Sequence, residues 1–330
     1  MRETPLISDL LTARAATLLR AGRLVAFPTE TVYGLGADAS NEAAVRRIFA
    51  VKARPADHPV IVHLPDATHL ERWAAEVPPM AAKLAAVFWP GPLTLVLKRA
   101  PNVSDAVTGG QNTVGLRVPN HCIALDVLQA FGGGIAAPSA NRFGRLSPTT
   151  AEHVRAELGE DVDLILDGGS CAVGIESTII DLSGPMPLLL RPGGISVEAI
   201  VRVIGTALPA AGAGAPRASG RLAAHYSPRT AMRVVSAQAL GELVAEQIAQ
   251  GRRVAVFARH LEVLAPKVIG RHAPESAVKY AHVMYGALRA LDDAEADLRL
   301  VESVPDDPDW LAVSDRLARA ARRDLEDDEP

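Results

Sequence analysis

The chain has 330 residues, of which 48% are hydrophobic and 22% are charged, and its net charge at pH 7 is −4. This length is sufficient for two ordinary domains, and the composition is typical of a globular protein. The small negative charge excludes a strongly basic surface over the whole molecule, as found in proteins that bind nucleic acid without sequence preference.

The cysteines and the apolar runs limit the kinds of metal site, cellular compartment and membrane segment to expect. Cys122 and Cys171 are isolated and lack the spacing of a zinc site, so no metal site built from protein ligands is predicted. Two isolated thiols are typical of a reducing compartment. No apolar run is long enough to cross a membrane, and the N-terminal residues lack the apolar core of a secretion signal. We therefore expect a cytoplasmic enzyme that makes no membrane contact.

Hydrophobic patterns of helical and strand period alternate as far as residue 205. Helices are expected at residues 6–21, 41–50, 79–88, 121–131 and 150–158. Strands are expected at residues 24–27, 60–62, 93–97, 114–116, 135–137, 164–166, 177–180 and 188–190. This mixture predicts an α/β domain over residues 1–205. Because some strands follow each other closely, its sheet is expected to be mixed rather than parallel.

The composition changes after residue 205. Residues 206–230 are rich in Ala, Gly and Pro and contain no acidic residue, so they are interpreted as a linker. Within residues 231–330, strands are expected at 232–235, 254–257 and 298–301, and helices at 238–250, 275–291 and 311–324. This alternation predicts a smaller three-layer α/β domain with a parallel sheet, followed by an acidic, solvated end.

Several common nucleotide-binding and hydrolase motifs are absent from the sequence. It contains no Gly-x-x-x-x-Gly-Lys-Ser/Thr loop, no Gly-x-Gly-x-x-Gly fingerprint and no Gly-x-Ser-x-Gly elbow. A nucleotide site in this chain would have to be built from other groups.

Two cations lie close together after the second expected helix. Lys52 and Arg54 precede Pro55 and Pro59. A guanidinium offers a planar fork of donors and an ammonium offers a point charge, and both bind phosphate oxygens. Such a pair can also be solvated surface residues. The Gly- and Thr-containing segment before the pair and the prolines after it favour a binding loop.

Other polar residues follow the ends of expected strands, where open α/β sheets bind ligands. Thr29 and Thr31 flank Glu30 after the first strand. The hydroxyl groups could hold a small polar substrate or cap a turn. The carboxylate could pair with a substrate amine or a nearby cation. His63 ends another strand, where a histidine is more often structural. Arg117 ends a third, where it could bind a substrate carboxylate or form an internal ion pair.

The later strands are followed by similar groups. Ser139 and Asn141 follow one strand, and Ser147 lies at an expected helix start that could hold an anion or simply be capped. Ser177 begins a strand, and Arg191 leaves the last one of this domain beside two glycines. In the linker, His-Tyr-Ser-Pro at residues 225–228 could cover a bound nucleotide or could contact a domain without a functional role.

These motifs together resemble the threonylcarbamoyl-AMP synthase family in its two-domain form, over nearly the whole chain. The matching motifs are Pro-Thr-Glu-Thr-Val-Tyr-Gly-Leu-Gly at 28–36, Lys-x-Arg-Pro at 52–55, Trp-Pro-Gly-Pro-Leu-Thr at 89–94, Ser-x-Asn at 139–141, Glu-Ser-Thr at 176–178 and Arg-Pro-Gly at 191–193. The resemblance implies an N-terminal YrdC-like domain with a twisted mixed sheet, a linker, and a smaller Rossmann-like three-layer domain.

The resemblance also implies an activity. The family condenses L-threonine, bicarbonate and ATP into threonylcarbamoyl-AMP and releases pyrophosphate. Partner proteins then transfer the threonylcarbamoyl group to the adenosine beside the anticodon of certain tRNAs. The chain is thus expected to be a nucleotidyltransferase that uses ATP with Mg²⁺, acts with downstream threonylcarbamoyl transferase proteins, and contacts tRNA only indirectly or weakly.

The resemblance assigns roles to individual residues. The L-threonine site would comprise Thr31, His63, Arg117, Ala137 and Ser177. The ATP site would comprise Arg54, His58, Thr113, Ser139, Ser147, Arg191 and Tyr226. The catalytic cluster would comprise Lys52, Arg54, Ser139 and Asn141. In this interpretation the cations and Mg²⁺ neutralise charge on the reacting phosphates, and Tyr226 covers the adenylate and slows its hydrolysis.

Two other functions were considered. The first is an RNA-binding module of the YrdC type without synthase activity. Residues 1–205 carry 18 Lys and Arg against 20 Asp and Glu, a net charge of −2, which disfavours it. The second is a related carbamoyl-transferring maturation module. Such chains carry acylphosphatase-like and zinc-finger segments, which this sequence lacks.

Overall fold

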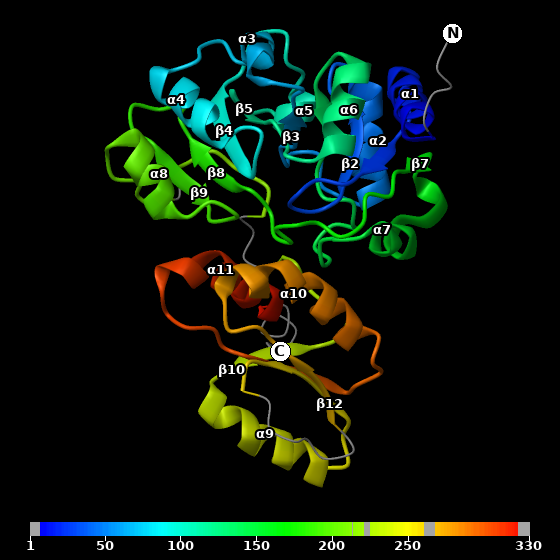
Figure 1. The fold of residues 1–330 in the computed structure, drawn as a ribbon, viewed down its shortest axis with the longest axis vertical. Helices are drawn as coiled ribbons and strands as arrows, with labels where there is room; N and C mark the ends of the chain where they lie inside the picture. Colours follow the sequence, from blue (N-terminus) through cyan, green and yellow to red (C-terminus); the bar gives the residue numbers. More distant parts are fainter. Residues whose placement is uncertain (1–6, 213, 221–224, 261–267, 323–330) are drawn as a thin grey trace. The chain divides into compact units, whose positions relative to one another are not determined.

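Figure 1 shows the fold in a computed structural model, which describes residues 7–212, 214–220, 225–260 and 268–322. Contacts divide the chain into two compact units. The first falls within Met1–Phe143, Pro148–Ala172 and Glu176–Arg221, and the second within Gly144–Ser147, Val173–Ile175 and Leu222–Pro330. The N-terminal residues, the acidic end and part of the expected linker lie outside the described residues.

The first unit is built on a mixed sheet with strand order β7-β1-β2-β6-β3-β5-β4-β8-β9. The strands are β1 (Val25–Phe27), β2 (Gly34–Asp38), β3 (Ile61–His63), β4 (Leu93–Lys98), β5 (Thr113–Arg117), β6 (Ile135–Ala136), β7 (Leu164–Ile165), β8 (Thr178–Asp181) and β9 (Leu188–Arg191). The sheet contains parallel pairs, such as β3 with β5, and antiparallel pairs, such as β4 with β5. The predicted mixed sheet is confirmed.

Helices cover this sheet. They are α1 (Ile7–Arg20), α2 (Glu42–Lys52), α3 (Leu70–Trp73), α4 (Pro79–Phe88), α5 (Asp105–Thr108), α6 (Cys122–Phe131), α7 (Ala151–Leu158) and α8 (Val197–Ile204), with 3-10 turns at Ala67–His69 and Gly159–Asp161. Asn41 caps α2 and Thr150 caps α7, each by accepting a hydrogen bond from the first turn of its helix. Buried aliphatic side chains dominate the core between the layers, as expected for a chain with few aromatic residues.

Strand β2, helix α8 and the two four-residue helices α3 and α5 of this unit were not predicted from the sequence. Strand β2 contains two glycines, which weaken the usual strand pattern. A Cβ on Gly36 would lie 2.6 Å from the Phe27 ring and 2.9 Å from a methyl of Ile135, so close packing requires glycine there. Helix α8 has Ser196 as its N-cap and Gly205 after its end, and it lies where the sequence was interpreted as the end of the domain.

The second unit contains a parallel sheet with strand order β10-β13-β11-β12. Its strands are β10 (Met232–Val235), β11 (Val254–Ala258), β12 (Val268–His272) and β13 (Leu298–Glu302), and its helices are α9 (Ala237–Ala249), α10 (Ala277–Asp292) and α11 (Leu311–Ala321), with a 3-10 turn at Pro308–Trp310. Helix α9 lies on one face of the sheet, and α10 and α11 lie on the other (Figure 1). The predicted three-layer unit is confirmed, although the exposed strand β12 was not predicted.

The first residues of the expected linker extend the sheet of the first unit. Leu189 of β9 donates to the Pro209 carbonyl at 2.8 Å, and Ala211 donates back to the Leu189 carbonyl at 3.0 Å. The division at residues 205 and 230 stays a prediction. None of the described helices is both long and apolar enough to span a membrane.

Candidate active site

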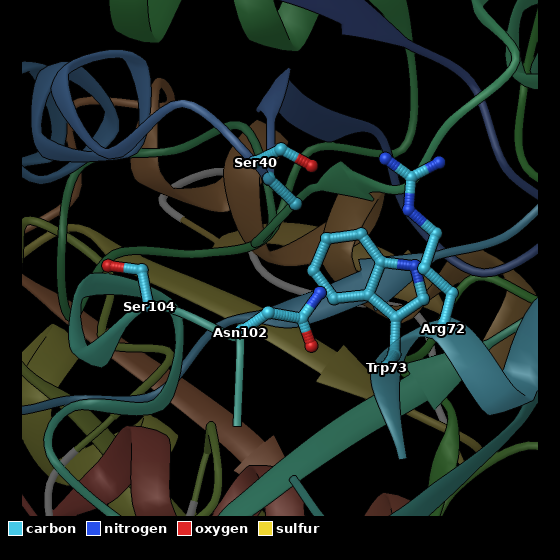
Figure 2. Close-up of a pocket in the computed structure, with 6 residues that line it drawn as sticks. Ser40, Arg72, Trp73, Asn102 and Ser104 are labelled. Atoms are coloured by element: carbon cyan, nitrogen blue, oxygen red, sulfur yellow. The ribbon is translucent and has the colours of Figure 1, made fainter. Parts of the chain in front are cut away.

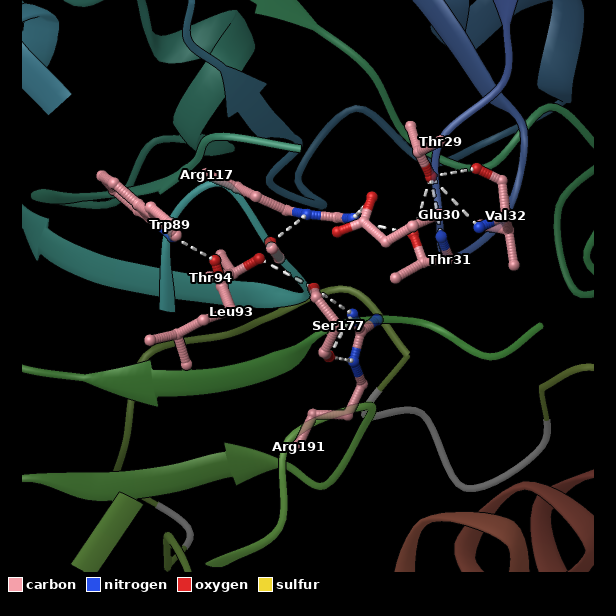
Figure 3. Close-up of polar contacts among 11 residues, drawn as sticks. Thr29, Glu30, Thr31, Val32, Trp89, Leu93, Thr94, Arg117, Ser177 and Arg191 are labelled. Atoms are coloured by element: carbon pink, nitrogen blue, oxygen red, sulfur yellow. Dashed lines mark hydrogen bonds and ion pairs between the residues drawn. The ribbon is translucent and has the colours of Figure 1, made fainter. Parts of the chain in front are cut away.

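The segment after β1 meets the end of β5 at a buried arginine. The Arg117 guanidinium lies 2.7 Å from a carboxylate oxygen of Glu30 and donates to the Thr31 hydroxyl at 2.9 Å (Figure 3). Its Nε donates to the Gly91 carbonyl at 3.2 Å. Thr29 and Thr31 share a hydrogen bond of 2.8 Å. Of the two roles considered for Arg117, the internal ion pair is therefore present.

Strand register places a histidine beside this arginine. His63 of β3 pairs with Arg117 of β5, so the two side chains project from the same face of the sheet. Ala137 follows β6 and donates its amide to the carbonyl of Ile61, two residues before His63. Three of the residues expected at the L-threonine site thus lie together across neighbouring strands.

His63 is buried and uncharged. Its side chain is 3% exposed, and among the described residues its Nδ1 has no hydrogen-bond partner. Burial, reinforced by the Arg117 charge, lowers the pKa of His63 to about 3. The imidazole is therefore neutral at physiological pH, so it can exchange one hydrogen bond with a ligand but cannot act as a cation.

Lys52 is directed at the chain rather than at solvent. It ends α2, is 1% exposed, and donates from Nζ to the Ser139 carbonyl at 2.5 Å and to the Asn141 carbonyl. Burial, with the Arg54 charge adding, lowers the pKa of Lys52 well below its ordinary value. The ammonium thus ties the end of α2 to the loop that carries Ser139 and Asn141.

Arg54 lies two residues later and contacts the linker. Its Nη2 donates to the Pro59 carbonyl at 2.8 Å and to the Ser219 hydroxyl at 3.1 Å, and its guanidinium lies 5.6 Å from the Phe143 ring centre. His58 packs edge-on against the same ring at 5.2 Å. Burial, followed by the Arg54 charge, lowers the pKa of His58.

A second arginine contacts the same linker residue. Arg191 donates from Nη1 to the Ser219 carbonyl at 2.9 Å. Its Nη2 donates to the Ser177 hydroxyl at 3.1 Å (Figure 3). A Cβ on Gly193 would lie 2.4 Å from the Ser177 carbonyl carbon. The glycine after Arg191 is therefore required by the chain's own backbone, which packs closely against Ser177.

The linker also lines a small cavity on this face of the sheet. The cavity is lined by Pro59, Val60, Ile61, Thr94, Val96, Gln111, Thr113, Gly115, Ile179, Arg217, Ala218 and Ser219. Thr113, which is expected at the ATP site, therefore lines the same cavity as Ser219, the linker residue that Arg54 and Arg191 contact.

Two of the predicted ATP contacts belong to the second unit. Ser147 is fully buried there, and Tyr226 is 1% exposed with a φ of 61°, in the left-handed region. The Tyr226 ring lies 4.1 Å from the His225 ring, and the Arg316 guanidinium stacks over it at 5.3 Å. Their contacts with ATP stay predictions.

A larger cavity contains none of the predicted site residues. It has a volume of about 210 Å³ and is lined by Ala39, Ser40, Arg72, Trp73, Asn102 and Ser104 (Figure 2). No group of three or more His, Cys, Asp or Glu side chains that could hold a metal ion occurs in the described ranges.

The structure therefore gathers most of the predicted residues of the first unit into three clusters. Lys52 holds the loop of Ser139 and Asn141, and Arg117 joins Thr31 and His63. Arg191 contacts Ser177 and shares Ser219 with Arg54. Sequence reasoning did not single out Thr94 or Ser219 as members of these clusters. Thr94 could have been considered because it ends the motif at 89–94, whereas nothing in the linker sequence marks Ser219.

Comparison with known proteins finds a matching family model for each part of the chain. The family model described as "Telomere recombination" (Sua5_yciO_yrdC) matches residues 17–193, and that of the "Threonylcarbamoyl-AMP synthase, C-terminal domain" matches residues 195–322. The crystal structure of Escherichia coli YciO, 26% identical, superposes with a TM-score of 0.52 over 60% of this chain and 95% of that one. The first unit therefore has the YrdC-like fold, and the chain is a two-domain protein of that class.

More similar relatives extend over both units. The threonylcarbamoyl-AMP synthases of Pyrococcus abyssi and Bacillus subtilis are each 41% identical, covering 93% and 95% of this chain and 93% and 94% of their own. The crystal structure of P. abyssi Sua5 complexed with L-threonine is 40% identical, with a TM-score of 0.90 over 96% of each chain. The chain belongs to the threonylcarbamoyl-AMP synthase family, in its two-domain form.

Proposed function

We propose that this protein condenses L-threonine, bicarbonate and ATP into threonylcarbamoyl-AMP and pyrophosphate. One observation supports this beyond family membership. Arg54 and Arg191, from distant parts of the chain, both donate hydrogen bonds to Ser219. Two buried guanidinium groups converging on one point are suited to the oxygens of a polyphosphate.

L-Threonine would bind beside Arg117. The arginine is already paired with Glu30 at 2.7 Å, so the pair is close to neutral as a unit. A threonine carboxylate would share the guanidinium, and its amine would be attracted by the Glu30 carboxylate. Neutral His63 and the hydroxyl groups of Thr31 and Ser177 would supply directional hydrogen bonds, while Ala137 would contact the substrate's apolar side.

ATP would bind between the two arginines and the loop of Ser139 and Asn141, with Thr113 at the cavity wall. Lys52 would act chiefly by fixing this loop, because its ammonium donates to two of the loop's carbonyls. Mg²⁺ would be carried by the phosphate oxygens of ATP. Contacts of ATP with His58, Ser147 and Tyr226 are assigned by family resemblance alone.

The chemistry would need charge stabilisation more than proton transfer. The threonine amine attacks the bicarbonate carbon, water leaves, and a carbamate forms. A carbamate oxygen then attacks the α-phosphorus of ATP, and the bond to the β-phosphate breaks. Negative charge grows on the phosphate oxygens, where Arg54 and Arg191 would stabilise it. Holding the reactants in line would supply much of the rate.

The downstream steps belong to this proposal. The product would pass to threonylcarbamoyl transferase proteins that modify tRNA next to the anticodon, with contact between this chain and tRNA indirect or weak, in the cytoplasm. The alternative is an RNA-binding module without synthase activity. Filter binding of tRNA across a salt series would test it, since binding dominated by phosphates weakens steeply with salt.

Pyrophosphate release tests the function directly. The assay contains ATP, bicarbonate and magnesium, with and without L-threonine, and compares wild type with Lys52→Ala. We expect release that depends on L-threonine and is lost in the variant. If release from folded wild-type protein does not depend on L-threonine, the proposed function is wrong.

A further inference from the structure

Thr94 lies in the candidate site but has no role in the expected mechanism. It is the second residue of β4 and is fully buried. Its hydroxyl oxygen lies 2.8 Å from that of Ser177, and Figure 3 shows the two hydroxyl groups between the Arg117 side and the Arg191 side of the network. The contact is fixed by the sheet, because Thr94 pairs with Ile179 of β8, two residues after Ser177.

The direction of this hydrogen bond can be deduced from the neighbouring groups. Each hydroxyl carries one proton and can accept two hydrogen bonds. Ser177 Oγ already accepts from Arg191 Nη2 at 3.1 Å. Among the described residues, Ser177 Oγ is the only recorded partner of the Thr94 hydroxyl. Either direction leaves one of the two hydroxyl protons without an acceptor in the described part of the protein. If Thr94 is the donor, the remaining proton is on Ser177, where an acceptor oxygen of a bound ligand can take it; we therefore assign Thr94 as the donor.

This assignment leaves one proton unused. With Arg191 and Thr94 both donating to Ser177 Oγ, the Ser177 hydroxyl has no accepting capacity left, and its own proton is directed away from both. If Ser177 were the donor in this hydrogen bond, its proton would instead be directed at the Thr94 oxygen. Thr94 therefore decides whether Ser177 presents a donor or an acceptor to a ligand.

We propose that Thr94 is a positioning residue that makes Ser177 a hydrogen-bond donor to a carboxylate oxygen of L-threonine. This rests on the proposed function, in which Ser177 contacts L-threonine. The register supports it: Thr94 directly precedes Leu95, whose partner Leu116 directly precedes Arg117. Thr94 and Arg117 thus lie at the same level of adjacent strands, so one carboxylate can meet both Ser177 and the guanidinium.

Threonine is suited to this role by its stiffness. Its branched Cβ restricts the side-chain torsion, which holds the hydroxyl in one direction. Burial on a central strand, between β5 and β8, removes competing water. Valine has nearly the same shape but no hydroxyl, so Thr94→Val removes the donor while leaving the packing in place.

The test is calorimetric binding of L-threonine and of ATP to the full chain, compared among four proteins. In Thr94→Val we expect the Kd for L-threonine to rise about tenfold, the scale of one hydrogen bond to a charged group, with the Kd for ATP changed less than about twofold. Thr94→Ser keeps the hydroxyl and should recover most of the affinity. Thr108→Val is the matched control, because Thr108 is equally buried but lies on α5.

A double-mutant cycle isolates the hydrogen bond. In Ser177→Ala there is no hydroxyl to orient, so adding Thr94→Val should cause little further loss of L-threonine affinity. Equal effects of Thr94→Val in both backgrounds, or unchanged L-threonine affinity in Thr94→Val, would overturn the inference. If Thr94→Val does not fold, Thr94→Ala replaces it in the same cycle. Failure of the wild type itself to bind L-threonine would instead overturn the proposed function.

Discussion

Arg117 and Glu30 form an ion pair with 2.7 Å between Nη2 and Oε2, although their side chains are only 4% and 7% exposed. Arg117 also holds Thr31, so the pair fixes the segment after β1 against the end of β5. Removing one member of a buried ion pair leaves the other charge without compensation, which is strongly destabilising. The site and the stability of the first unit are therefore linked through one contact.

The first prediction concerns this pair. Glu30→Gln leaves the Arg117 charge buried without its partner, so we expect the free energy of unfolding to fall by about 3–5 kcal/mol. Urea denaturation measures it. Glu42→Gln is the matched control, because Glu42 pairs with Arg46 at an exposed position and should change stability far less. Equal losses of unfolding free energy in the two variants would show that the buried pair matters no more to stability than the exposed one.

The second prediction is a pH dependence that arises from His63. Its pKa is about 3 in the folded protein, against an ordinary value of about 6.5 in the unfolded chain. As pH falls below 6.5, the unfolded chain takes up a proton that the folded protein does not, so stability falls until the pH reaches the folded pKa. Between pH 7 and pH 5 this loss is about 2 kcal/mol.

His63→Gln removes this titration. We expect the variant to lose about 2 kcal/mol less stability than wild type between pH 7 and pH 5, as measured by urea denaturation at each pH. His272→Gln, at an exposed position on β12, is the control for replacing a histidine. Parallel pH profiles of wild type and His63→Gln would contradict the assignment of a neutral, buried imidazole.

The third prediction concerns Lys52. Lys52→Met keeps much of the side chain's volume but leaves the Ser139 and Asn141 carbonyls without this donor. We expect kcat/KM for ATP to fall by about 10²–10³, as when a group that places transition-state contacts is lost. The readout is pyrophosphate release. Lys83→Met, at an exposed position on α4, is the control, and similar activities of the two variants would rule out a special role for Lys52.

The fourth prediction compares two glycines that both have ordinary backbone angles. A Cβ at Gly193 would lie 2.4 Å from backbone atoms of residues 176–178, whereas a Cβ at Gly184 would have no heavy atom within 4 Å. Gly193→Ala must shift the backbone at Ser177, so we expect weaker L-threonine binding and a lower melting temperature. Gly184→Ala should match wild type in both measurements. Loss in both variants would point to a general intolerance of alanine.

Much of the fold could be predicted because strong patterns coincide with its central elements. The apolar run of β4 and the buried run of β11 were both recognised, and so was the change from a mixed sheet to a parallel one. Helices α3 and α5 have only four residues each, too few to show a helical period. Strands β2 and β12, which were not predicted either, have residues that serve other purposes. β2 needs Gly36 for close packing, and β12 is an exposed edge strand with Arg and His.

The motifs indicated which residues to expect at the candidate site, but not where their side chains point. The motifs indicated that Lys52, Arg117 and Ser177 mattered. They did not indicate that Lys52 points at backbone carbonyls, because a spacing in the sequence does not fix where a long side chain ends. Nor could they pair Thr94 with Ser177, since that contact depends on the register between β4 and β8.

The position of Ser219 has a consequence for affinity. Arg54 and Arg191 both donate hydrogen bonds to Ser219. A nucleotide that binds these donors would therefore have to replace the hydrogen bonds to Ser219. The measured affinity would depend on the free energy of the nucleotide-bound state relative to the state in which the arginines bind Ser219. The linker would then be an intramolecular competitor, whose effective concentration depends on the length of the chain that carries it. Weakening that competitor would tighten nucleotide binding without changing any group that touches the nucleotide.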